Sequence, residues 1–310
     1  MPCRRMADAA HTLTESAFAD DRRNESRRPF RKARRARERV RLLGQTVDLV
    51  RPEEVLHHVE TWIADGRKAV VANHNLNSLA LLQKHPELQR FFDRADLVEV
   101  DSTPLIHFAK VLGLHGRAFH RCTYLDWRDH FWSLANRNGW RVMYVGGAPQ
   151  VVDKARLRLS QLHPGAKIQV RDGYFDATSG SVENAAVVEQ VCAFSPDVLF
   201  VGMGMPRQEL WILNNLDALP ISVIFSVGAA FDYEAGAQAE APRWMGRMGI
   251  EWLFRLVHDP RRLARRYLIE PWSLSGLVLK DVAEAVRCRF DGQAVSDRVD
   301  SETRSPRPVA

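Results

Sequence analysis

Several patterns that mark common protein classes are missing from this sequence. There is no run of about 18 uninterrupted apolar residues, so no helix is expected to span a membrane. Residues 1–20 hold no apolar segment of the kind found in signal peptides. HExxH and GxSxG motifs are absent, which leaves proteolysis and ester hydrolysis without support. The sequence therefore predicts a protein that is soluble or lies on a membrane surface.

Cysteines are few and far apart. The four of them form no CxxC pair and stand at Cys3, Cys122, Cys192 and Cys288. This spacing argues against a zinc site and against a disulfide framework. Free, scattered cysteines suit a reducing cytoplasm, which is where we expect the protein to reside.

The segment FVGMGMPRQELWI, residues 200–212, is similar to two nucleotide-binding motifs but completes neither. An apolar strand runs into Gly202-Met203-Gly204, yet the third glycine of a dinucleotide-binding turn is missing, and so is the Lys-Ser/Thr pair of a P-loop. The acidic residue expected downstream in NAD enzymes is also missing. The sequence therefore argues against an NAD enzyme.

Positive charge is concentrated in two parts of the chain. The formal net charge is +6. Residues 22–41 hold eleven Lys and Arg against two Glu, and residues 243–289 hold ten against five acids. Such clusters indicate a polyanionic partner, namely an acidic membrane, a phosphorylated substrate or a nucleic acid. Residues 1–45 are expected to be a disordered Arg-rich arm, either a solvated tail or misassigned start, or a functional arm.

From residue 46 onward, apolar strands alternate with amphipathic helices. The alternation predicts the α/β class, with a Rossmann-like, mostly parallel sheet and helices on both faces. We assign residues 46–242 to this α/β core. Residues 243–290 predict a basic C-terminal helical appendage, and residues 291–310 a disordered tail.

Ligands of open parallel sheets bind beyond the C-terminal ends of the strands, where helix N-termini point N–H groups outward. Four places in this sequence have that form, with polar or glycine residues at Asn73 and Asn75, Asp101, Gly146 and Gly147, and Gly202 and Gly204. Glycine lets the backbone approach a phosphate closely, although short turns use glycine for other reasons. Several such loops at one edge predict a nucleotide or sugar-nucleotide site.

Asp101 is the sharpest candidate for chemistry. A carboxylate at the end of an apolar strand is poorly solvated and suits a general base. The alternative is a helix N-cap formed by Asp101 or Ser102. Glu99 would share a strand face with Asp101, so a metal site is a further, weaker reading. Gln208 and Glu209 either bind a sugar or uracil edge or complement a helix dipole.

The C-terminal arginines are spaced for one helical face. Arg255, Arg262 and Arg266 follow each other at seven and four residues, and each is able to bind a phosphate through two hydrogen bonds. The aromatic and aliphatic side chains near them fit an interfacial helix, with Trp252, Leu253, Phe254, Leu256 and Trp272. The alternative is ordinary core packing with a basic outer face.

Taken together, these segments resemble the WecG/TagA/CpsF glycosyltransferases. LFVGMGMPRQELWI, SVGAAFDYEAG, APRWMGRMGIEWLFRL and DPRRLARRYL are similar to the C-terminal half of the family. NHNLNSLALLQKHPEL, ADLVEVDSTPLIHFAKVLG and YVGGAPQVVDKARLRL match the N-terminal half in order. The resemblance covers residues 46–270.

The resemblance implies an inverting transfer of a hexose-type sugar from a UDP-sugar to a glycosyl-diphospho-polyprenol, in polysaccharide biosynthesis at the inner face of the bacterial cytoplasmic membrane. It implies that Asp101 is the base, that the Gly202–Gly204 loop with Gln208 and Glu209 holds the donor, and that no metal or other cofactor is needed. It also places Arg121 and Asp126, from RCTYLDW, in the substrate site. The appendage is expected to dock on an anionic membrane.

This chain departs from the family pattern at three positions. Asn73 stands where the family has a threonine and Ser102 where it has a glycine, and RCTYLDW lacks the glycine of the Gly-x-Asp that many members have. The donor sugar is therefore left open. One rival hypothesis is a non-catalytic scaffold of a membrane-associated assembly complex, and another is a basic nucleic-acid-binding protein. Aromatic and basic residues do not interleave as the second requires, so no nucleic acid is expected. A homo-oligomer is left open.

Overall fold

The computed structural model of the chain describes residues 39–238, 241, 245 and 250–290. All of these residues belong to the unit Arg35–Ala310. Most of the expected arm, residues 1–38, and the expected tail, residues 291–310, lie outside the described residues. The disorder expected for those two segments therefore stays a prediction.

Six parallel strands form the central sheet. Their bounds are β3 Ala69–His74, β4 Leu97–Val100, β5 Arg141–Gly146, β6 Lys167–Arg171, β7 Val198–Gly202 and β8 Val223–Ser226. They are ordered β4-β3-β8-β7-β5-β6, and each adjacent pair is parallel. β4, β7 and β8 are buried along their whole length. Strands buried on both faces read as continuous apolar runs, as the sequence does here.

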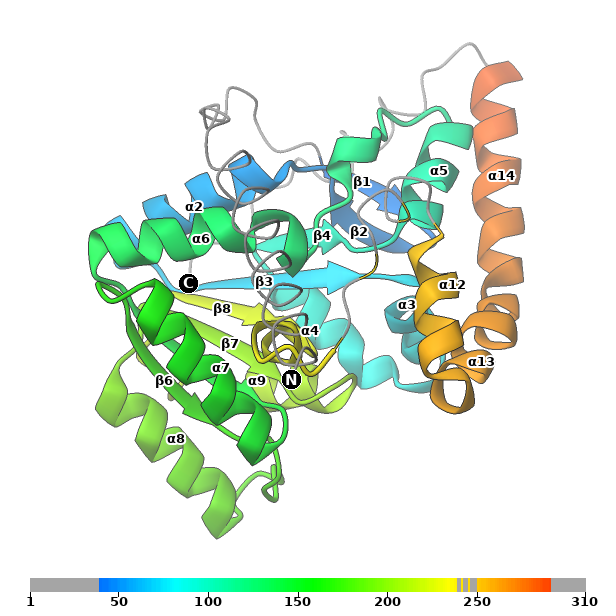
Figure 1. Ribbon diagram of the computed structural model, residues 1–310. Helices are drawn as coiled ribbons and strands as arrows, with labels where there is room; N and C mark the ends of the chain where they lie inside the picture. The colour runs from blue at the N-terminus through cyan, green and yellow to red at the C-terminus, as the bar shows by residue number, and fades with distance from the viewer. Residues whose placement is uncertain (1–38, 239–240, 242–244, 246–249, 291–310) are drawn as a thin grey trace, which may run out of the picture. The chain divides into compact units, whose positions relative to one another are not determined.

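Helices cover both faces of this sheet (Figure 1). One apolar cluster joins the sheet to α3 Leu76–Lys84, α4 Gln89–Arg94, α5 Thr103–Val111, α8 Val182–Phe194 and α9 Arg207–Asn215. A second cluster joins the opposite face to α2 Pro52–Ala64, α6 Tyr124–Asn138, α7 Pro149–Leu162 and α10 Ala230–Glu234. Successive residues of a strand alternate between the clusters, so Ala72 packs in the first and Val71 in the second. The predicted Rossmann-like arrangement is confirmed.

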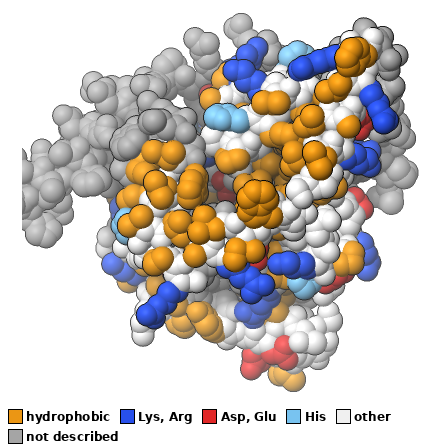
Figure 2. Space-filling model, turned by 90° about the vertical axis from the view of Figure 1, so that its right-hand side faces the viewer, with side chains coloured by type: hydrophobic (Ala, Val, Ile, Leu, Met, Phe, Trp, Pro, Cys, Tyr) orange, Lys and Arg blue, Asp and Glu red, His pale blue; other side chains and the backbone are white. Residues whose placement is uncertain are grey.

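The C-terminal segment is helical where it is described. It comprises α12 Glu251–His258, α13 Pro260–Leu268, a 3-10 turn η3 Glu270–Leu274 and α14 Ser275–Phe290. These helices lie on the right-hand side of Figure 1, and Figure 2 shows hydrophobic side chains gathering on that face with Lys and Arg beside them. Within the described residues, no helix is both long and apolar enough to cross a membrane.

A short antiparallel hairpin precedes the sheet and corrects one expected boundary. β1 Arg39–Leu42 pairs with β2 Gln45–Asp48, so residues 39–45 are folded although the sequence analysis placed them in the arm. Leu43 and Gly44 form the two-residue turn with φ of 50° and 77°. Positive φ at both turn positions matches the right-handed twist of the flanking strands.

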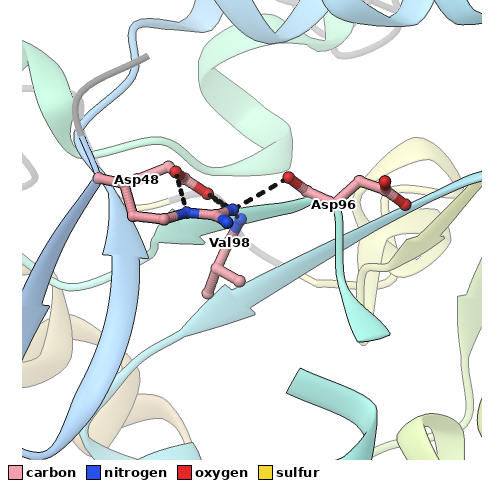
Figure 3. Close-up of polar contacts among 4 residues, drawn as sticks. Asp48, Asp96 and Val98 are labelled. Carbon is pink, nitrogen blue, oxygen red and sulfur yellow. Dashed lines mark hydrogen bonds and ion pairs between the residues drawn. The ribbon is translucent and has the colours of Figure 1, made fainter. Parts of the chain in front are cut away.

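The buried carboxylate of Asp48 ties this hairpin to the sheet (Figure 3). It accepts two hydrogen bonds from the guanidinium of Arg39, at 2.9 and 3.0 Å, and one from the N–H of Val98 at 2.8 Å. Arg39 also donates to the carbonyl of Asp96 at 3.1 Å. A buried charge needs such a full set of partners, and here they fix β2 beside β4.

The far side of the hairpin contacts α14. The N–H of Leu43 donates to the carboxylate of Asp281 at 2.6 Å, and Arg289 donates to the carbonyl of Val111, at the end of α5, at 3.1 Å. Ala285 and Cys288 of α14 are buried. The last described helix is therefore attached to both the hairpin and α5.

Candidate functional site

The strand-end residues predicted from the sequence lie along one edge of the sheet. The N–H of Asp101, after β4, donates to the carbonyl of His74 at the end of β3, at 2.9 Å. Gly146, at the end of β5, pairs with Gly202, at the end of β7. β8 lies between β3 and β7. The four predicted loops therefore open on the same side, as expected for a parallel sheet.

Acidic groups gather where β4 ends. We call this cluster the acid corner, made of Glu99, Asp101, Cys122 and Asp126. Arg121 pairs with Val100 in a parallel bridge, and the N–H of Cys122 donates to the carbonyl of Val100 at 3.0 Å. This pairing brings the segment before α6 against the outer side of β4.

Glu99 is the most deeply buried acid of the corner, with 4% of its surface exposed. The thiol of Cys122 donates to Glu99 Oε1 at 3.2 Å. Burial raises the pKa of Glu99 to about 8, the charges of Asp101 and Asp126 act in the same direction, and the Cys122 hydrogen bond opposes them. Burial likewise raises the pKa of Cys122. Both groups are therefore neutral at pH 7, which makes Glu99 a poor metal ligand.

The structure also bears on the choice between a base and a helix cap. α5 begins at Thr103 with Ser102 at its N-cap position, and the Ser102 side chain makes no capping hydrogen bond. Asp101 stands one residue before that position and is half-buried. The capping alternative is therefore wrong for Ser102 and stays open for Asp101, which lies between a buried strand and a helix N-terminus.

The two asparagines that follow β3 have structural partners. Asn73 Nδ2 donates to the carbonyl of Ser226 on β8 at 2.7 Å. Asn75 caps α3, since its Oδ1 accepts from the N–H of Ser78 at 3.0 Å while the Ser78 hydroxyl accepts from the Asn75 N–H at 2.9 Å. Both side chains therefore hold this edge of the sheet in shape, whatever else they contact.

Asp126 has a similar local task in the first turn of α6. Its carboxylate accepts from the N–H and the hydroxyl of Thr123, at 3.1 and 2.9 Å. An acid at this position satisfies free N–H groups and complements the helix dipole. The structure thus places Asp126 at the rim of the acid corner, with Arg121 five residues before it on the strand side.

At the ends of β5, β7 and β8, the sheet edge consists of closely packed backbone groups rather than charged side chains. We call Tyr144, Gly146, Gly202 and Gly228 the glycine corner. The Tyr144 hydroxyl lies 3.3 Å from the carbonyl of Gly202 and 3.1 Å from that of Gly228. A Cβ on Gly146 would collide with the Gly202 carbonyl, and one on Gly202 would collide with the Gly228 carbonyl and the Tyr144 hydroxyl. Close backbone packing therefore explains these two glycines without a ligand.

Gln208 and Glu209 lie in the first turn of α9, each with 1% of its surface exposed. Gln208 Oε1 accepts from the N–H of Gly204 at 3.1 Å, and its Nε2 donates to Glu209 Oε1 at 2.7 Å. Glu209 Oε2 is buried without a hydrogen-bond partner, and burial raises the pKa of Glu209 to about 7. The pair holds the glycine loop, and one oxygen of Glu209 is buried without a hydrogen-bond partner in the described structure.

Arg207 was not predicted as a site residue, and it links the start of α9 to the loop after β6. Its guanidinium donates to the carbonyl of Gly173 at 2.8 Å and to that of Phe175, and it lies over the Phe175 ring. Beside it is a groove of about 770 Å³ lined by residues of the loop after β6 and of α9, including Tyr174, Asp176 and Trp211. Its position directly before the predicted Gln208–Glu209 pair is the signal by which the sequence could have identified it.

The C-terminal arginines are placed only in part. Arg255 lies in α12, and Arg262 and Arg266 lie in α13, but their side chains are outside the described part of the structure. No group of three or more His, Cys, Asp or Glu that would hold a metal occurs among the residues that the structure describes. The expected metal independence stays a prediction.

Comparison with known proteins supplies a family. The model of the glycosyl transferase WecG/TagA/CpsF family matches residues 40–287. Among curated proteins, N-acetylglucosaminyldiphosphoundecaprenol N-acetyl-beta-D-mannosaminyltransferases of Staphylococcus aureus strains MW2 and NCTC 8325 / PS 47 are each 26% identical over 237 residues. Each alignment covers 73% of this chain and 87% of the relative.

Proposed function

Because the chain belongs to the glycosyl transferase WecG/TagA/CpsF family, we propose that it transfers a hexose-type sugar from a UDP-sugar to a glycosyl-diphospho-polyprenol. The attacking acceptor hydroxyl forms a new C1–O bond as the bond from C1 to the UDP oxygen breaks on the opposite face, which inverts the anomeric centre. The hydroxyl proton passes to a carboxylate, and UDP leaves. Family membership favours this reaction over a scaffold or a nucleic-acid-binding protein.

One observation supports the catalytic assignment. Asp101 lies at the sheet edge, where its N–H donates to the carbonyl of His74 and so connects the ends of β4 and β3. Among the acids of the corner, Glu99 is buried and Asp126 is exposed on α6, whereas Asp101 is half-buried at the strand end, so Asp101 is the carboxylate that we assign as general base. A base near an apolar strand end takes a proton readily from a bound hydroxyl. Arg121, held beside β4 by the Val100 bridge, is assigned to substrate binding.

The donor diphosphate is assigned to the glycine loops of the same edge. Gly147 and Gly204 have positive φ values of 65° and 82°, and each precedes a helix N-terminus, those of α7 and α9. N–H groups at helix N-termini stabilise phosphate charge. The Gln208–Glu209 pair, which is bonded to the N–H of Gly204, is assigned to the same donor site.

The acceptor diphosphate and the departing UDP need cations. Arg255, Arg262 and Arg266 are assigned to them, since a guanidinium binds phosphate oxygens in pairs and keeps its charge at all relevant pH values. These arginines would stabilise the leaving group without a metal ion. Addition of EDTA is therefore expected to leave transfer unchanged.

The test is UDP release by purified protein with a panel of UDP-hexoses and UDP-N-acetylhexosamines. The acceptor is a short-chain lipid analogue carrying N-acetylglucosaminyl diphosphate, the group printed in the names of the S. aureus relatives. Asp101→Asn is expected to lower acceptor-dependent release at least about a hundredfold, because a general base contributes on the order of 10² to 10⁴.

Asp153→Asn is the matched control, since Asp153 is an exposed acid on α7 at 4.0 Å from Arg156. It should retain wild-type release. If Asp101→Asn and Asp153→Asn behave alike, Asp101 is not the base. If folded wild-type protein releases no UDP with any donor, the transfer reaction itself is wrong for this chain.

We further propose that the C-terminal helices dock on an anionic membrane surface, where a lipid-linked acceptor would be found. Apolar side chains are exposed there at Trp252, Leu253, Val257, Leu268, Ile269 and Trp272. Trp272 is 76% exposed, and exposed Arg261 and Arg265 flank this group on α13. An apolar face edged by arginines is the pattern of an interfacial helix.

Sedimentation with vesicles tests this docking. Vesicles containing phosphatidylglycerol should retain the protein, pure phosphatidylcholine vesicles should retain much less, and Leu268→Ser with Trp272→Ser should reduce retention by roughly tenfold. Val182→Ser is the control, because Val182 is an equally exposed apolar residue on α8. Equal loss in both variants would contradict docking through the C-terminal helices.

A further inference from the structure

The acid corner contains a second carboxyl group that the proposed reaction does not use. Glu99 and Asp101 are two residues apart on β4 and its extension, so they face the same side of the sheet. Asn73 of β3 is the register partner of Glu99, and the Cys122 thiol donates to Glu99 Oε1 at 3.2 Å. A buried side chain that is hydrogen-bonded in this way has little freedom to swing toward solvent.

The groups around Glu99 come from each element packed against it. Asp101 extends its own strand, Asn73 faces it from β3, Arg121 and Cys122 follow η2 Ala118–His120, and Asp126 and Trp127 come from α6. Asp101 and Asp126 act on Glu99 as negative charges. An ionised Glu99 would therefore be a third negative charge in a buried corner.

We infer that Glu99 is a positioning residue for Asp101, an un-ionised acid that keeps the buried part of the acid corner free of a second charge beside the base. This inference rests on the proposed function. Both substrates carry a diphosphate, and negative charge grows on the departing UDP during transfer. A carboxylate at Glu99 would repel these anions in a place where water screens charge weakly.

The consequence is a particular pH dependence. The pKa of Glu99 is raised to about 8 by burial, so Glu99 gains its charge as the pH rises through that value. In the wild type, kcat/KM for the acceptor should fall above pH 8 and be at least about tenfold lower at pH 9.5 than at pH 7, because one negative charge is added beside the base.

Glu99→Gln is the direct test, because glutamine has the shape of the un-ionised acid and never ionises. We expect it to transfer within about threefold of wild type at pH 7 and to lose the alkaline decline. Cys122→Ala supplies a second variant. Removing the thiol donor removes a hydrogen bond that lowers the pKa of Glu99, so the decline should move to higher pH. A purely structural role for Glu99 would change stability and leave the shape of both profiles alone.

The profiles are measured as acceptor-dependent UDP release between pH 6 and 10, with circular dichroism at each pH to confirm folding. The same alkaline decline in Glu99→Gln and wild type would overturn the inference and leave the transfer reaction standing. So would a loss of a hundredfold or more at pH 7 in folded Glu99→Gln, because the ionisable acid itself would then be needed. Absence of release by wild type at every pH would overturn the proposed function, and with it this inference.

Discussion

The acid corner and the glycine corner occupy different parts of the same sheet edge, one at the outer strand β4 and the other at the inner strands β8, β7 and β5, and they are built in opposite ways. In the acid corner, side chains carry the chemistry, and burial sets their charge, as it does for Glu99. In the glycine corner, Gly146 and Gly202 lack a side chain, which leaves room for neighbouring backbone and for the Tyr144 hydroxyl. The acid corner should therefore respond to a change in pH, and the glycine corner to a change in side-chain volume.

The largest expected effect is a loss of stability caused by added side-chain volume in the glycine corner. Gly202→Ala places a methyl group against the Gly228 carbonyl and the Tyr144 hydroxyl, and backbone cannot yield as a flexible side chain can. We expect a loss of more than about 4 kcal/mol of unfolding free energy, or no folded protein. Urea unfolding measures it.

Gly276→Ala is the control for this variant. A Cβ on Gly276, in α14, meets nothing within 4 Å, and alanine favours the helix by about 1 kcal/mol. Equal stability of the two alanine variants would mean that the glycine corner is not closely packed.

The second effect is a change of stability with pH that comes from the ionisation of Glu99 in the acid corner. The pKa of Glu99 rises from its ordinary value of 4.5 to about 8 in the folded protein, so the folded chain keeps a proton that the unfolded chain releases between these two pH values. Wild-type stability should therefore fall as the pH rises across this window, whereas Glu99→Gln has no such loss. The difference in unfolding free energy between Glu99→Gln and the wild type should therefore change by about 1.4 kcal/mol per pH unit in this window, in favour of the variant as the pH rises.

Chemical unfolding at pH 5, 6, 7 and 8 measures that gap. Asp153→Asn serves again as a control, because its acid is exposed on α7. A gap between Glu99→Gln and wild type that stays constant from pH 5 to pH 8 would contradict the burial of an un-ionised acid.

A smaller effect separates hydrogen bonding from volume within the glycine corner. Tyr144→Phe keeps the ring, which stacks on Phe231 at 4.0 Å, and removes the hydroxyl beside the Gly202 and Gly228 carbonyls. We expect a loss of about 1 kcal/mol, since the hydroxyl has one proton to donate and the Gly202 carbonyl also accepts from the N–H of Gly147 at 3.2 Å. Thermal unfolding measures this, and an unchanged Tm would show that other donors satisfy both carbonyls.

The smallest expected effect on stability comes from Asn73, which lies on β3 between the two corners. Asn73→Ala removes the hydrogen bond to the Ser226 carbonyl and should cost about 1 kcal/mol. Asn73→Thr restores the residue type of the family, so a donor panel run with this variant also reports whether Asn73 sets sugar preference. An identical panel for wild type and Asn73→Thr would limit Asn73 to its structural bond.

The order of strands and helices could be predicted because alternation and strand-end residues are local signals. Several elements were missed, β1 and α6 among them. Arg39 and Arg41 made β1 look like part of the basic arm, although Val40 and Leu42 alternate with them and are buried. α6 was read only as a motif, although Trp127 and Phe131 follow helical spacing and are buried.

The strand ends of the site were predicted, but the state of their side chains was not. The protonation of Glu99 depends on burial by α6 and on Cys122, which is 23 residues away. The Tyr144 hydroxyl reaches carbonyls 58 and 84 residues further along the chain. Spacing in a sequence carries no information on such contacts until the strand order is known.

The bond from Leu43 to Asp281 joins residues 238 apart in the chain, and this has a consequence for the order of assembly on the ribosome. The link from Asp48 to Val98 spans only 50 residues and is able to form while most of the sheet is still being synthesised. The attachment of the hairpin to α14 must wait until translation has passed Asp281. The hairpin therefore completes its contacts in two stages, the second after the whole sheet has left the ribosome.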